Sequence, residues 1–505
     1  MRPPYRALEK EAAISDCTSH DAGMGEVDHP WLPRSEADAT RVPDLGRLLR
    51  DYRTAESLTQ GQLGKLLGVD QTYISKIERG HRVIRDMGFL LNVSRILRVA
   101  PEQLGLAGDG FQGEAVPQDA VAASQERWRV GRRYLNQHRA ELARQASLLY
   151  PSDVRLKSTA LIAPREWLPD EPVRLEEIEL EWVDGSMPRG IDGTEPESQQ
   201  VRPLRALGRQ FESYTSAVRY LDPPKLFENR PSYRLTDVHW TQSGGRMCFG
   251  LANYFDKLDV SEAIGHELAL VQMENTVEKV NRLADLPFRS LIGDPFAFGR
   301  RAMIPAITTL TLRRRRTHGD ASFLLHWRDP RRVATASGLY DVIPAGEFQP
   351  SSMAPWDRSN DFDLWRNVVR ELSEELLGTP EHDGSRSTPI DYDAWPLYRD
   401  LQRGRMNGQV SIYCLGVALD SLTLATTILT ALVIDDDLFD RIFADIVQMN
   451  AEGITVSAVD GMAGGKGIPF SEGNVGRLLR KEPMASPGAG CLALAWRHRG
   501  LLLTS

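Results

Sequence analysis

Six side chains that can form hydrogen bonds fall within nine positions near the start of the chain. They are Gln71, Thr72, Tyr73, Ser75, Lys76 and Arg79. Amide, hydroxyl and guanidinium groups can pair with base edges in the major groove of DNA, and the cations can also bind phosphates. If the segment is helical, Ile74 and Ile77 share the opposite, inward face, because residues three apart lie on one side of a helix. The spacing therefore predicts a polar helix face suited to a DNA groove.

The residues around this face predict the elements that hold it in place. Thr59 can cap one helix and Asp70 the next, since their side-chain oxygens accept N–H groups that a first helical turn leaves unpaired. Three leucines at helical spacing predict an apolar face between the two caps: Leu63, Leu66 and Leu67. Gly68 then suits the left-handed residue that ends a helix. Apolar stripes at residues 45–52 and 89–97 predict a further helix on each side.

Residues 43–106 resemble the phage-repressor-like (XRE) helix-turn-helix family, including its Ile-Glu-Arg-Gly ending at residues 77–80. The resemblance implies that the helix at residues 59–68 lies across the DNA backbone, with Gln60 near a phosphate. It also implies that the following helix enters the major groove.

The same resemblance gives roles to the polar face. Gln71 would read an adenine edge through two hydrogen bonds. Further contacts to bases or phosphates would come from Thr72, Ser75 and Lys76, while Arg79 and Arg82 would touch phosphates. The alternative is a protein-binding module in which Gln71 is a solvated surface residue.

The local charge favours DNA. Residues 41–106 carry 11 Lys or Arg against 7 Asp or Glu, a net charge of +4 in a chain whose net charge is −8. A positive segment inside an acidic chain is typical of a small DNA-binding unit.

A second group of residues with the chemistry for a site lies far downstream. In a helix over residues 364–378, Glu371, Glu374 and Glu375 have spacings of three and four, so their carboxylates share one face. Like charges on one face repel one another unless a cation compensates. Mg²⁺ prefers oxygen ligands and bridges to phosphates, so the three glutamates predict a magnesium site.

Residues 305–499 resemble Nudix domains, on two motifs. Residues 370–375 match the R-E-U-x-E-E core of the Nudix box, and residues 344–346 stand where the family has Pro-Gly-Gly. The resemblance implies a fold with strands and helices, Mg²⁺ on the helical glutamates, and attack of water on a diphosphate.

The box departs from the family pattern. Gly346 and Arg370 lie 24 positions apart where the family has 14, so about ten residues are inserted. Phe362 stands where the upstream glutamate belongs, between Asp361 and Asp363, and Leu377 takes the place of the final glycine. These departures predict that metal binding survives and that hydrolysis is lost.

Three other patterns carry weaker predictions. His266-Glu267 begins a zinc motif, but Leu270 stands where its second histidine belongs, which predicts a structural histidine. Residues 461–467 resemble a phosphate loop but are too short and end in glycine, which predicts a flexible loop. Residues 313–316 are four arginines, which predict a solvated strand end or, alternatively, the basic rim of a nucleotide pocket.

Composition favours a cytoplasmic protein. The four cysteines lie far apart without metal-ligand spacing, and the first residues lack the apolar run of a signal peptide. Residues 412–434 are the most apolar region, but Asp420 interrupts them and threonines recur, which predicts buried strands rather than a membrane span.

These observations predict a multidomain chain with an all-α helix-turn-helix domain followed by an α/β or α+β Nudix-like half. The expected parts are a flexible tail (1–40), the helix-turn-helix domain (41–107), a linker (108–125), a region of mixed helices and strands (126–304) and the Nudix-like domain (305–505). Local patterns predict helices at 127–149, 205–221 and 260–283 and a late strand at 492–496.

The function that these parts predict is transcriptional regulation. The N-terminal domain would bind double-stranded DNA as part of a homodimer held by the C-terminal half, since one short helix reads few base pairs. The C-terminal half would sense a small, nucleotide-derived ligand. The competing hypothesis is an active Mg-dependent Nudix hydrolase of nucleoside diphosphate derivatives, fused to a DNA-binding domain.

Overall fold

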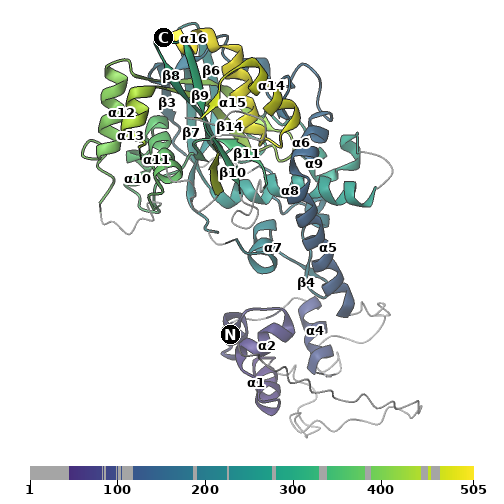
Figure 1. The fold of residues 1–505 in the computed structure, drawn as a ribbon. Coiled ribbons are helices and arrows are strands. Elements are labelled where there is room, and N and C mark those ends of the chain that lie inside the picture. Colours follow the sequence, from purple (N-terminus) through teal and green to yellow (C-terminus); the bar gives the residue numbers. More distant parts are fainter. Residues whose placement is uncertain are drawn as a thin grey trace, which may run out of the picture. The chain divides into compact units, whose positions relative to one another are not determined.

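The computed structural model divides the chain into two compact units, Met1–Gln112 and Gly113–Ser505 (Figure 1). The residues that it describes are 45–81, 84, 87–97, 99, 104, 118–185, 190–224, 227–275, 280–328, 338–380, 388–444, 453–456 and 467–504. The predicted tail, residues 108–117 of the predicted linker, Arg82 and residues 461–466 of the glycine-rich segment lie outside these ranges.

Among the described residues of the first unit, the regular elements are all helices, as predicted. Its helices are α1 (Leu45–Ala55), α2 (Gln60–Leu67), α3 (Gln71–Glu78) and α4 (Met87–Leu97). One core joins them, with Leu49, Leu67, Ile74 and Val93 at 0% exposure. Each helix is too short to be stable alone in water, so this shared core holds the unit together.

The second unit combines helices and sheets. Its α-helices are α5 (Gln118–Gln137), α6 (Arg139–Ser147), α7 (Tyr214–Leu221), α8 (Tyr254–Glu274), α9 (Pro287–Ile292), α10 (Asp357–Asn360), α11 (Leu364–Leu377), α12 (Pro396–Met406), α13 (Asp436–Ile442), α14 (Glu472–Lys481), α15 (Ser486–Arg497) and α16 (Arg499–Thr504). Short 3₁₀ turns are η3 (Arg165–Trp167), η4 (Leu175–Glu177), η5 (Pro196–Val201) and η6 (Leu283–Asp285).

The strands of this unit run from β1 to β16. They are β1 (Leu161–Ile162), β2 (Val173–Arg174), β3 (Ile178–Trp182), β4 (Leu204–Ala206), β5 (Arg209–Gln210), β6 (Pro231–Thr241), β7 (Gly244–Asn253), β8 (Pro305–Arg315), β9 (Asp320–Phe323), β10 (Leu325–Arg328), β11 (Tyr340–Val342), β12 (Ala345–Glu347), β13 (Val410–Asp420), β14 (Thr426–Asp435), β15 (Gly453–Val456) and β16 (Ile468–Pro469). Among the described residues, the main sheet has the order β1-β13-β14-β8-β9-β16, with β2 beside β13 and β12 beside β8.

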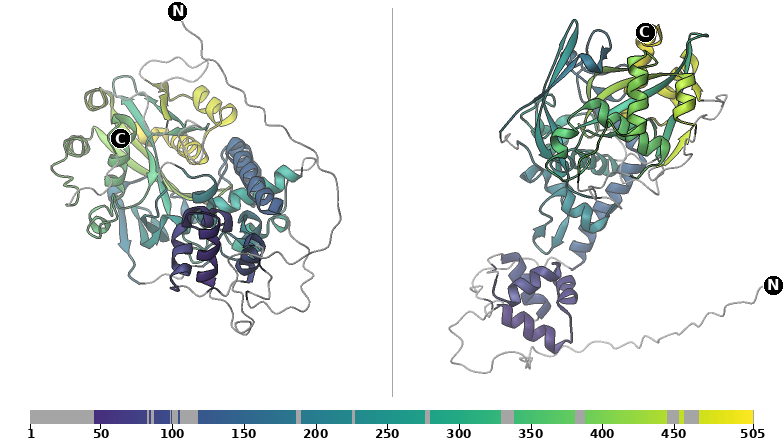
Figure 2. Two further views of the ribbon diagram at one scale, coloured as in Figure 1. Left: turned by 90° about the horizontal axis from the view of Figure 1, so that it is seen from below. Right: turned by 90° about the vertical axis from the view of Figure 1, so that its left-hand side faces the viewer.

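Smaller sheets flank the main one. They have the orders β11-β10-β15, β3-β7-β6 and β4-β5. The β6–β7 hairpin is the longest of these pairings and is drawn in teal in the two further views (Figure 2).

The centre of the main sheet lies between two apolar cores. β14 pairs antiparallel with β13 and parallel with β8, and its side chains are buried along its whole length. Because alternate side chains of a strand point to opposite faces, Ile428 and Leu432 join the core that includes α11, whereas Leu429 and Val433 join the core that includes α15. The buried strands predicted at residues 412–434 are therefore confirmed.

The strand predicted at residues 492–496 is wrong, because these residues lie in α15. A short apolar run does not distinguish a buried strand from a buried helix. Pro487 in the first turn of α15 was the overlooked signal, since proline suits the start of a helix.

The helix predicted at residues 205–221 begins later than expected. Its first part is the β4–β5 hairpin, which turns at Gly208 with a φ of +66°, and Ser213 then caps α7. The helix predicted at residues 127–149 is two helices, α5 and α6, which meet at His138. The helix predicted at residues 260–283 is α8, which begins at Tyr254 and ends at Glu274.

The predicted boundaries inside the second unit do not match the structure. Residues 118–125, predicted as linker, belong to α5. Residues 126–304 and 305–505 do not form separate units, since one core contains side chains from both, such as Trp128 and Val368. β1 also pairs with β13 across that predicted boundary.

Candidate nucleic-acid interface and acidic cleft

The start and end of α2 are fixed by the residues that the sequence indicated. Thr59 Oγ1 accepts the Gln62 N–H at 3.2 Å, and Gln62 Oε1 accepts the Thr59 N–H at 2.8 Å, which completes a capping box. Gly68 ends the helix in the left-handed conformation, with a φ of +69°. Leu63 and Leu67 are buried, but Leu66 is 50% exposed, so it does not belong to the predicted apolar face.

The orientation of α3 leaves a polar surface open. Asp70 Oδ1 accepts the Tyr73 N–H at 2.7 Å, which caps the helix as predicted. Ile74 and Ile77 are 0% and 2% exposed, so they fix the inward face. The exposed side chains on the other face are Gln71, Thr72, Lys76 and Arg79, with Ser75 half-buried beside them. Five of the six predicted contact residues therefore share one accessible surface.

Tyr73 is placed differently from the other five. Its side chain is half-buried, and its ring packs edge-on against Phe89 of α4, with ring centroids 5.6 Å apart. The ring therefore connects α3 to the core rather than lying on the exposed face. Sequence spacing alone missed this, because Tyr73 follows directly after two exposed residues.

Gln60 is held by a buried carboxylate that the sequence reading did not single out. Its Nε2 donates to Glu78 Oε2 at 2.8 Å. Glu78, only 6% exposed, also receives two hydrogen bonds from Arg53 of α1, at 2.8 and 3.2 Å, and its main-chain oxygen receives one from Arg50. The sequence did contain a clue to this network, because Glu78 is the glutamate of the Ile-Glu-Arg-Gly motif at residues 77–80.

The network shifts the titration of Glu78. Burial by itself raises the pKa of this carboxyl. The hydrogen bonds from Arg53 and Gln60, with the charges of Arg53 and Arg50, lower it more, so the pKa lies below its usual value. An ionised Glu78 thus ties the end of α3 to α1 and to the start of α2.

The three predicted metal ligands divide between two environments. Glu371 and Glu374 line a cleft together with Arg230 and Arg370. Glu375 is 6% exposed, and its Oε1 accepts the Ala345 N–H of β12 at 3.2 Å. Glu371 Oε1 accepts a hydrogen bond from Asn367 at 3.2 Å. Within the described ranges, no group of three or more His, Cys, Asp or Glu side chains is arranged to hold a metal ion.

A glycine allows β12 to approach α11. A Cβ atom on Gly346 would lie 2.0 Å from the carboxylate carbon of Glu371, so a larger residue here would displace the end of that side chain. The spacing of residues 344–346 and 370–375 in the sequence thus corresponds to a direct contact in space.

The residues inserted before α11 form an ordered element around Asp361. This fully buried carboxylate accepts the Ser351 N–H and the Tyr392 hydroxyl, both at 2.7 Å. Phe362 packs against the ring of Tyr233, and Asp363 caps α11 through the Arg366 N–H at 2.9 Å. Asp361 and Phe362 thus hold the inserted residues in place, and Asp363 begins α11.

Arg370 supplies positive charge to the same region. Its Nη2 donates to Gln349 O at 2.8 Å, and its Nη1 lies 3.9 Å from Asp361 Oδ2. Burial lowers the pKa of this guanidinium, but Tyr392, Asp361, Glu371 and Glu374 raise it more, so the net shift is upward. The cleft therefore presents two carboxylates beside a permanent cation.

The weaker motifs have structural roles. His266 is fully buried, its Nδ1 lies 3.1 Å from the Tyr214 hydroxyl, and burial with nearby arginines lowers its pKa to about 3. Glu267 accepts the N–H groups of Phe288 and Arg289 at 2.7 and 2.9 Å, at the start of α9.

The arginine run is less solvated than predicted. Arg313 and Arg314 are buried, and they pair with Asp440 and Asp435 at 2.7 and 2.8 Å. Only Arg315 and Arg316 are exposed, and both are also ion-paired.

No helix among the described residues has the length and apolarity needed to cross a bilayer.

Comparison with known proteins defines the class of the first unit. Residues 44–106 match the family model described as a helix-turn-helix domain. The resemblance predicted for this segment is confirmed at that level: α1 to α4 are a helix-turn-helix domain. Over 86 residues, 17% of this chain, the sequence is 34% identical to the HTH-type transcriptional regulator SlrR of Bacillus subtilis (strain 168). The match covers 53% of that regulator, so the chain spans about half the length of this relative.

Proposed function

We propose that this protein is a sequence-specific DNA-binding transcriptional regulator in which α3 reads the major groove. The observation that carries the proposal is the polar face of α3, on which Gln71, Thr72, Lys76 and Arg79 are exposed and Ser75 is half-buried, while the other face is fixed in a core. The net charge of +4 over residues 41–106 supports it, because DNA binding draws much of its affinity from phosphate contacts. The name of the relative from Bacillus subtilis agrees with this function.

The side chains have different tasks on DNA. Gln71 pairs with an adenine edge, and Thr72, Ser75 and Lys76 contact neighbouring bases or phosphates. Arg79 binds a phosphate, which positions the domain without reading sequence. Gln60 Nε2 has two N–H donors, so it can bind a phosphate through one of them while the other stays on Glu78 Oε2. The protein acts as a homodimer, because one short helix reads too few base pairs for a specific site, and its proposed location is the cytoplasm.

Selection of binding sites tests this function. The full chain is incubated with a random duplex library, the bound fraction is sequenced, and the affinity is then measured at several salt concentrations. We expect one enriched motif and a steep loss of non-specific affinity with salt, since cations that bind phosphates release counterions. Equal affinity for all duplexes, or a flat salt dependence, would favour a protein partner instead.

We further propose that the second unit is Nudix-like and senses a nucleotide-derived ligand at the acidic cleft. Glu371 and Glu374 offer oxygen ligands for Mg²⁺, and Arg230 and Arg370 offer positive charge to a phosphate group. Glu375 fits less well, because its Oε1 already accepts the Ala345 N–H. Ligand binding would alter DNA affinity to the extent that the ligand prefers one conformation.

The competing function is hydrolysis, which is favoured by two half-buried carboxylates, those of Glu371 and Glu374, in the lining of one cleft. A titration of the full chain with Mg²⁺ and nucleoside diphosphate compounds separates the two. For a sensor we expect a higher melting temperature with no release of phosphate or nucleoside monophosphate. Metal-dependent turnover that disappears in the Glu374→Gln, Glu375→Gln double variant would establish the enzyme. An unchanged melting temperature and no turnover would reject both.

A further inference from the structure

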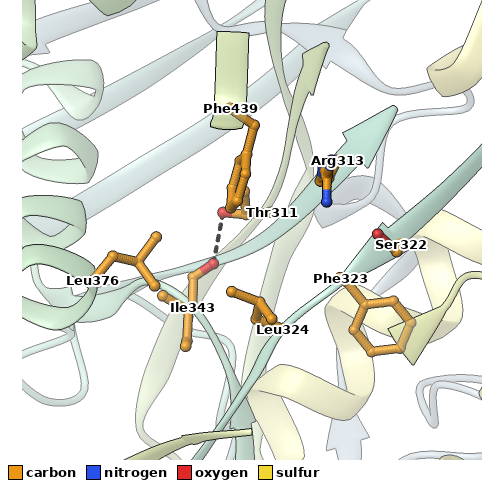
Figure 3. A pocket seen from close by; sticks show the side chains of 8 residues that line it. All are labelled: Thr311, Arg313, Ser322, Phe323, Leu324, Ile343, Leu376 and Phe439. Carbon is orange, nitrogen blue, oxygen red and sulfur yellow. Dashed lines mark hydrogen bonds between the residues drawn. The ribbon is translucent and has the colours of Figure 1, made fainter. Parts of the chain in front are cut away.

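The pocket beside Phe439 is too small to hold an organic ligand. Figure 3 shows Thr311, Ile343 and Leu376 in its lining, and the Thr311 hydroxyl donates to Ile343 O at 2.7 Å. Its volume is about 10 Å³, which is the space of one water molecule. The feature that points to a partner lies instead on the surface of the second unit, at strand β3.

β3 is an edge strand. It pairs in parallel with β7, and within the described ranges it has no strand on its other side. The Val183 N–H, directly after β3, donates to Phe249 O of β7 at 2.8 Å. Because the main-chain groups of successive strand residues point to alternate sides, those of Leu180 and Trp182 point away from β7. One side of β3 therefore presents main-chain donors and acceptors to a further strand.

β3 and the insertion that it contacts also carry exposed apolar side chains. Trp182 is 38% exposed, although its ring packs against those of Tyr233 and Phe362 at centroid distances of 6.4 and 5.5 Å. Phe362 belongs to the insertion before α11, which also carries Met353 and Trp356, 61% and 47% exposed. These three are half of the large apolar side chains that are exposed among the described residues of the second unit. Exposed tryptophan and methionine side chains are typical of protein interfaces.

We propose that β3 is the dimer interface of this protein, where it pairs antiparallel with β3 of a second copy across a two-fold axis. An open strand edge is complementary to itself in the antiparallel orientation, so a second copy satisfies the outward main-chain groups of Leu180 and Trp182. The inference rests on the proposed homodimer, in which the second copy supplies the second recognition helix. The joined edges make one continuous sheet from β6, β7 and β3 of each copy.

The charges of β3 determine the position of the axis. Glu179 and Glu181 are both exposed. An axis at Leu180 would place Glu179 opposite Glu181 of the second copy, and like charges directly opposite each other destabilise a sheet. An axis at Trp182 places Glu181 opposite Val183 of the second copy and brings the two Trp182 residues together. The axis therefore lies at Trp182.

Sedimentation of the full chain without DNA tests the interface. We expect a dimer with a dissociation constant of about 10 μM or lower, and a monomer up to about 100 μM would overturn the proposal. Leu180→Pro removes an outward N–H without removing a hydrogen bond to β7, and Trp182→Glu places two like charges at the axis. Each should raise the dissociation constant at least about thirtyfold, as loss of a main interface contact does.

The control variant is Tyr220→Glu, at an exposed aromatic residue of α7, which should leave the dissociation constant unchanged. Unchanged association in both Leu180→Pro and Trp182→Glu, or loss of the dimer in Tyr220→Glu, would contradict the interface at β3. A melting curve for each variant shows that it is folded.

Cysteine cross-linking tests the position of the axis. Residues that face themselves across an antiparallel two-fold axis have Cα atoms about 5.5 Å apart, within the range of a disulfide. Trp182→Cys should therefore give a cross-linked dimer with diamide as oxidant. Leu180→Cys should not, because its two copies would lie about 13 Å apart along the strands. Cross-linking of Leu180→Cys alone would reject this axis, and no more cross-linking than in the wild-type chain would reject the pairing of β3.

These measurements are independent of DNA reading by α3. Dimerisation is measured without DNA, and the monomeric variants should still bind a duplex that carries one half-site. Absence of any selected DNA motif would reject the proposed regulator and leave the interface intact. A monomeric wild-type chain that still selects a motif would reject the interface alone.

Discussion

Glu78 connects three helices of the DNA-binding domain through one ionised carboxylate. Arg53, Gln60 and the main chain of α3 meet there, so the group fixes how α3 is presented. Its pKa is lowered in the folded state by Arg53 and Gln60, which outweigh the upward effect of burial. A lowered pKa contributes stability above the unfolded pKa of about 4.3, and that contribution is lost as the pH falls through the folded pKa.

Glu78→Gln should therefore destabilise the first unit by about 1–3 kcal/mol at neutral pH, because it removes a buried carboxylate that the partly buried guanidinium of Arg53 binds through two hydrogen bonds. It should also flatten the loss of stability between neutral pH and acid. Hydrogen exchange of α1 to α3 in the full chain gives the local stability. The control is Glu56→Gln, at an exposed position, which should change stability by less than about 0.5 kcal/mol. Equal effects of the two variants would rule out a special role for Glu78.

Substitution of Gln71 tests whether a single side chain of α3 recognises a base. Its side chain is exposed at the first residue of α3. Gln71→Ala should weaken binding to the selected operator by about 1–3 kcal/mol and relax the preference at one base pair. Gln137→Ala, at an exposed position of α5, serves as the control and should leave affinity unchanged. A similar loss on operator and random DNA would mean that Gln71 only positions the domain.

At the scale of elements, the close packing of α2 against the turn before α3 requires a glycine within α2. A Cβ atom on Gly64 would lie 2.6 Å from Val69 O, whereas the nearest atom to a Cβ on Gly61 is 3.9 Å away. Gly64→Ala should therefore force the helices apart and cost about 1–3 kcal/mol. Gly61→Ala, in the same helix, should be neutral or stabilise by up to about 1 kcal/mol, because alanine favours helix. Hydrogen exchange of α2 and α3 compares the two, and equal costs would contradict the close contact.

The elements also show what the sequence determines locally. The caps at Thr59 and Asp70 and the end at Gly68 were predicted correctly, because each depends on side chains within a few residues. The burial of Tyr73 against Phe89 and the binding of Gln60 by Glu78 were not predicted, since both depend on partners 16 or 18 positions away. The apolar run of α15 was misassigned as a strand because burial on all sides removes the periodic pattern.

In the acidic cleft, too, arrangements within one helix were predicted from the sequence, and contacts between distant segments were not. Of the three glutamates predicted to share one face of a helix, Glu371 and Glu374 line one cleft, whereas Glu375 is buried against β12. The contributions of Arg230 and Gln349 to that cleft could not be read from spacing, because they come from other parts of the chain. Likewise, the insertion was recognised by counting, but its anchoring at Asp361 required the fold.

At the scale of the whole molecule, the second unit is stabilised by contacts across its sequence midpoint. Arg289, which precedes β8, donates to Ser421 O in the β13–β14 turn at 2.8 Å, and Arg301 donates to Leu424 O at 2.7 Å. Both guanidinium groups are buried, at 2% and 1% exposure, so these bonds are not replaced by water. The region before residue 305 is thus part of the structure that supports the main sheet.

Dividing the chain at two positions tests this organisation. Fragments 1–112 and 113–505 should each unfold cooperatively, because each is a compact unit with its own core. Fragments 113–304 and 305–505 should not fold separately. The division exposes both halves of the core that contains Trp128, Tyr233 and Val368. It also leaves Arg289 and Arg301 without their carbonyl partners. Circular dichroism during heating distinguishes these outcomes. A cooperative transition in isolated residues 305–505 would show that they form an independent domain, and would restore the boundary predicted from sequence.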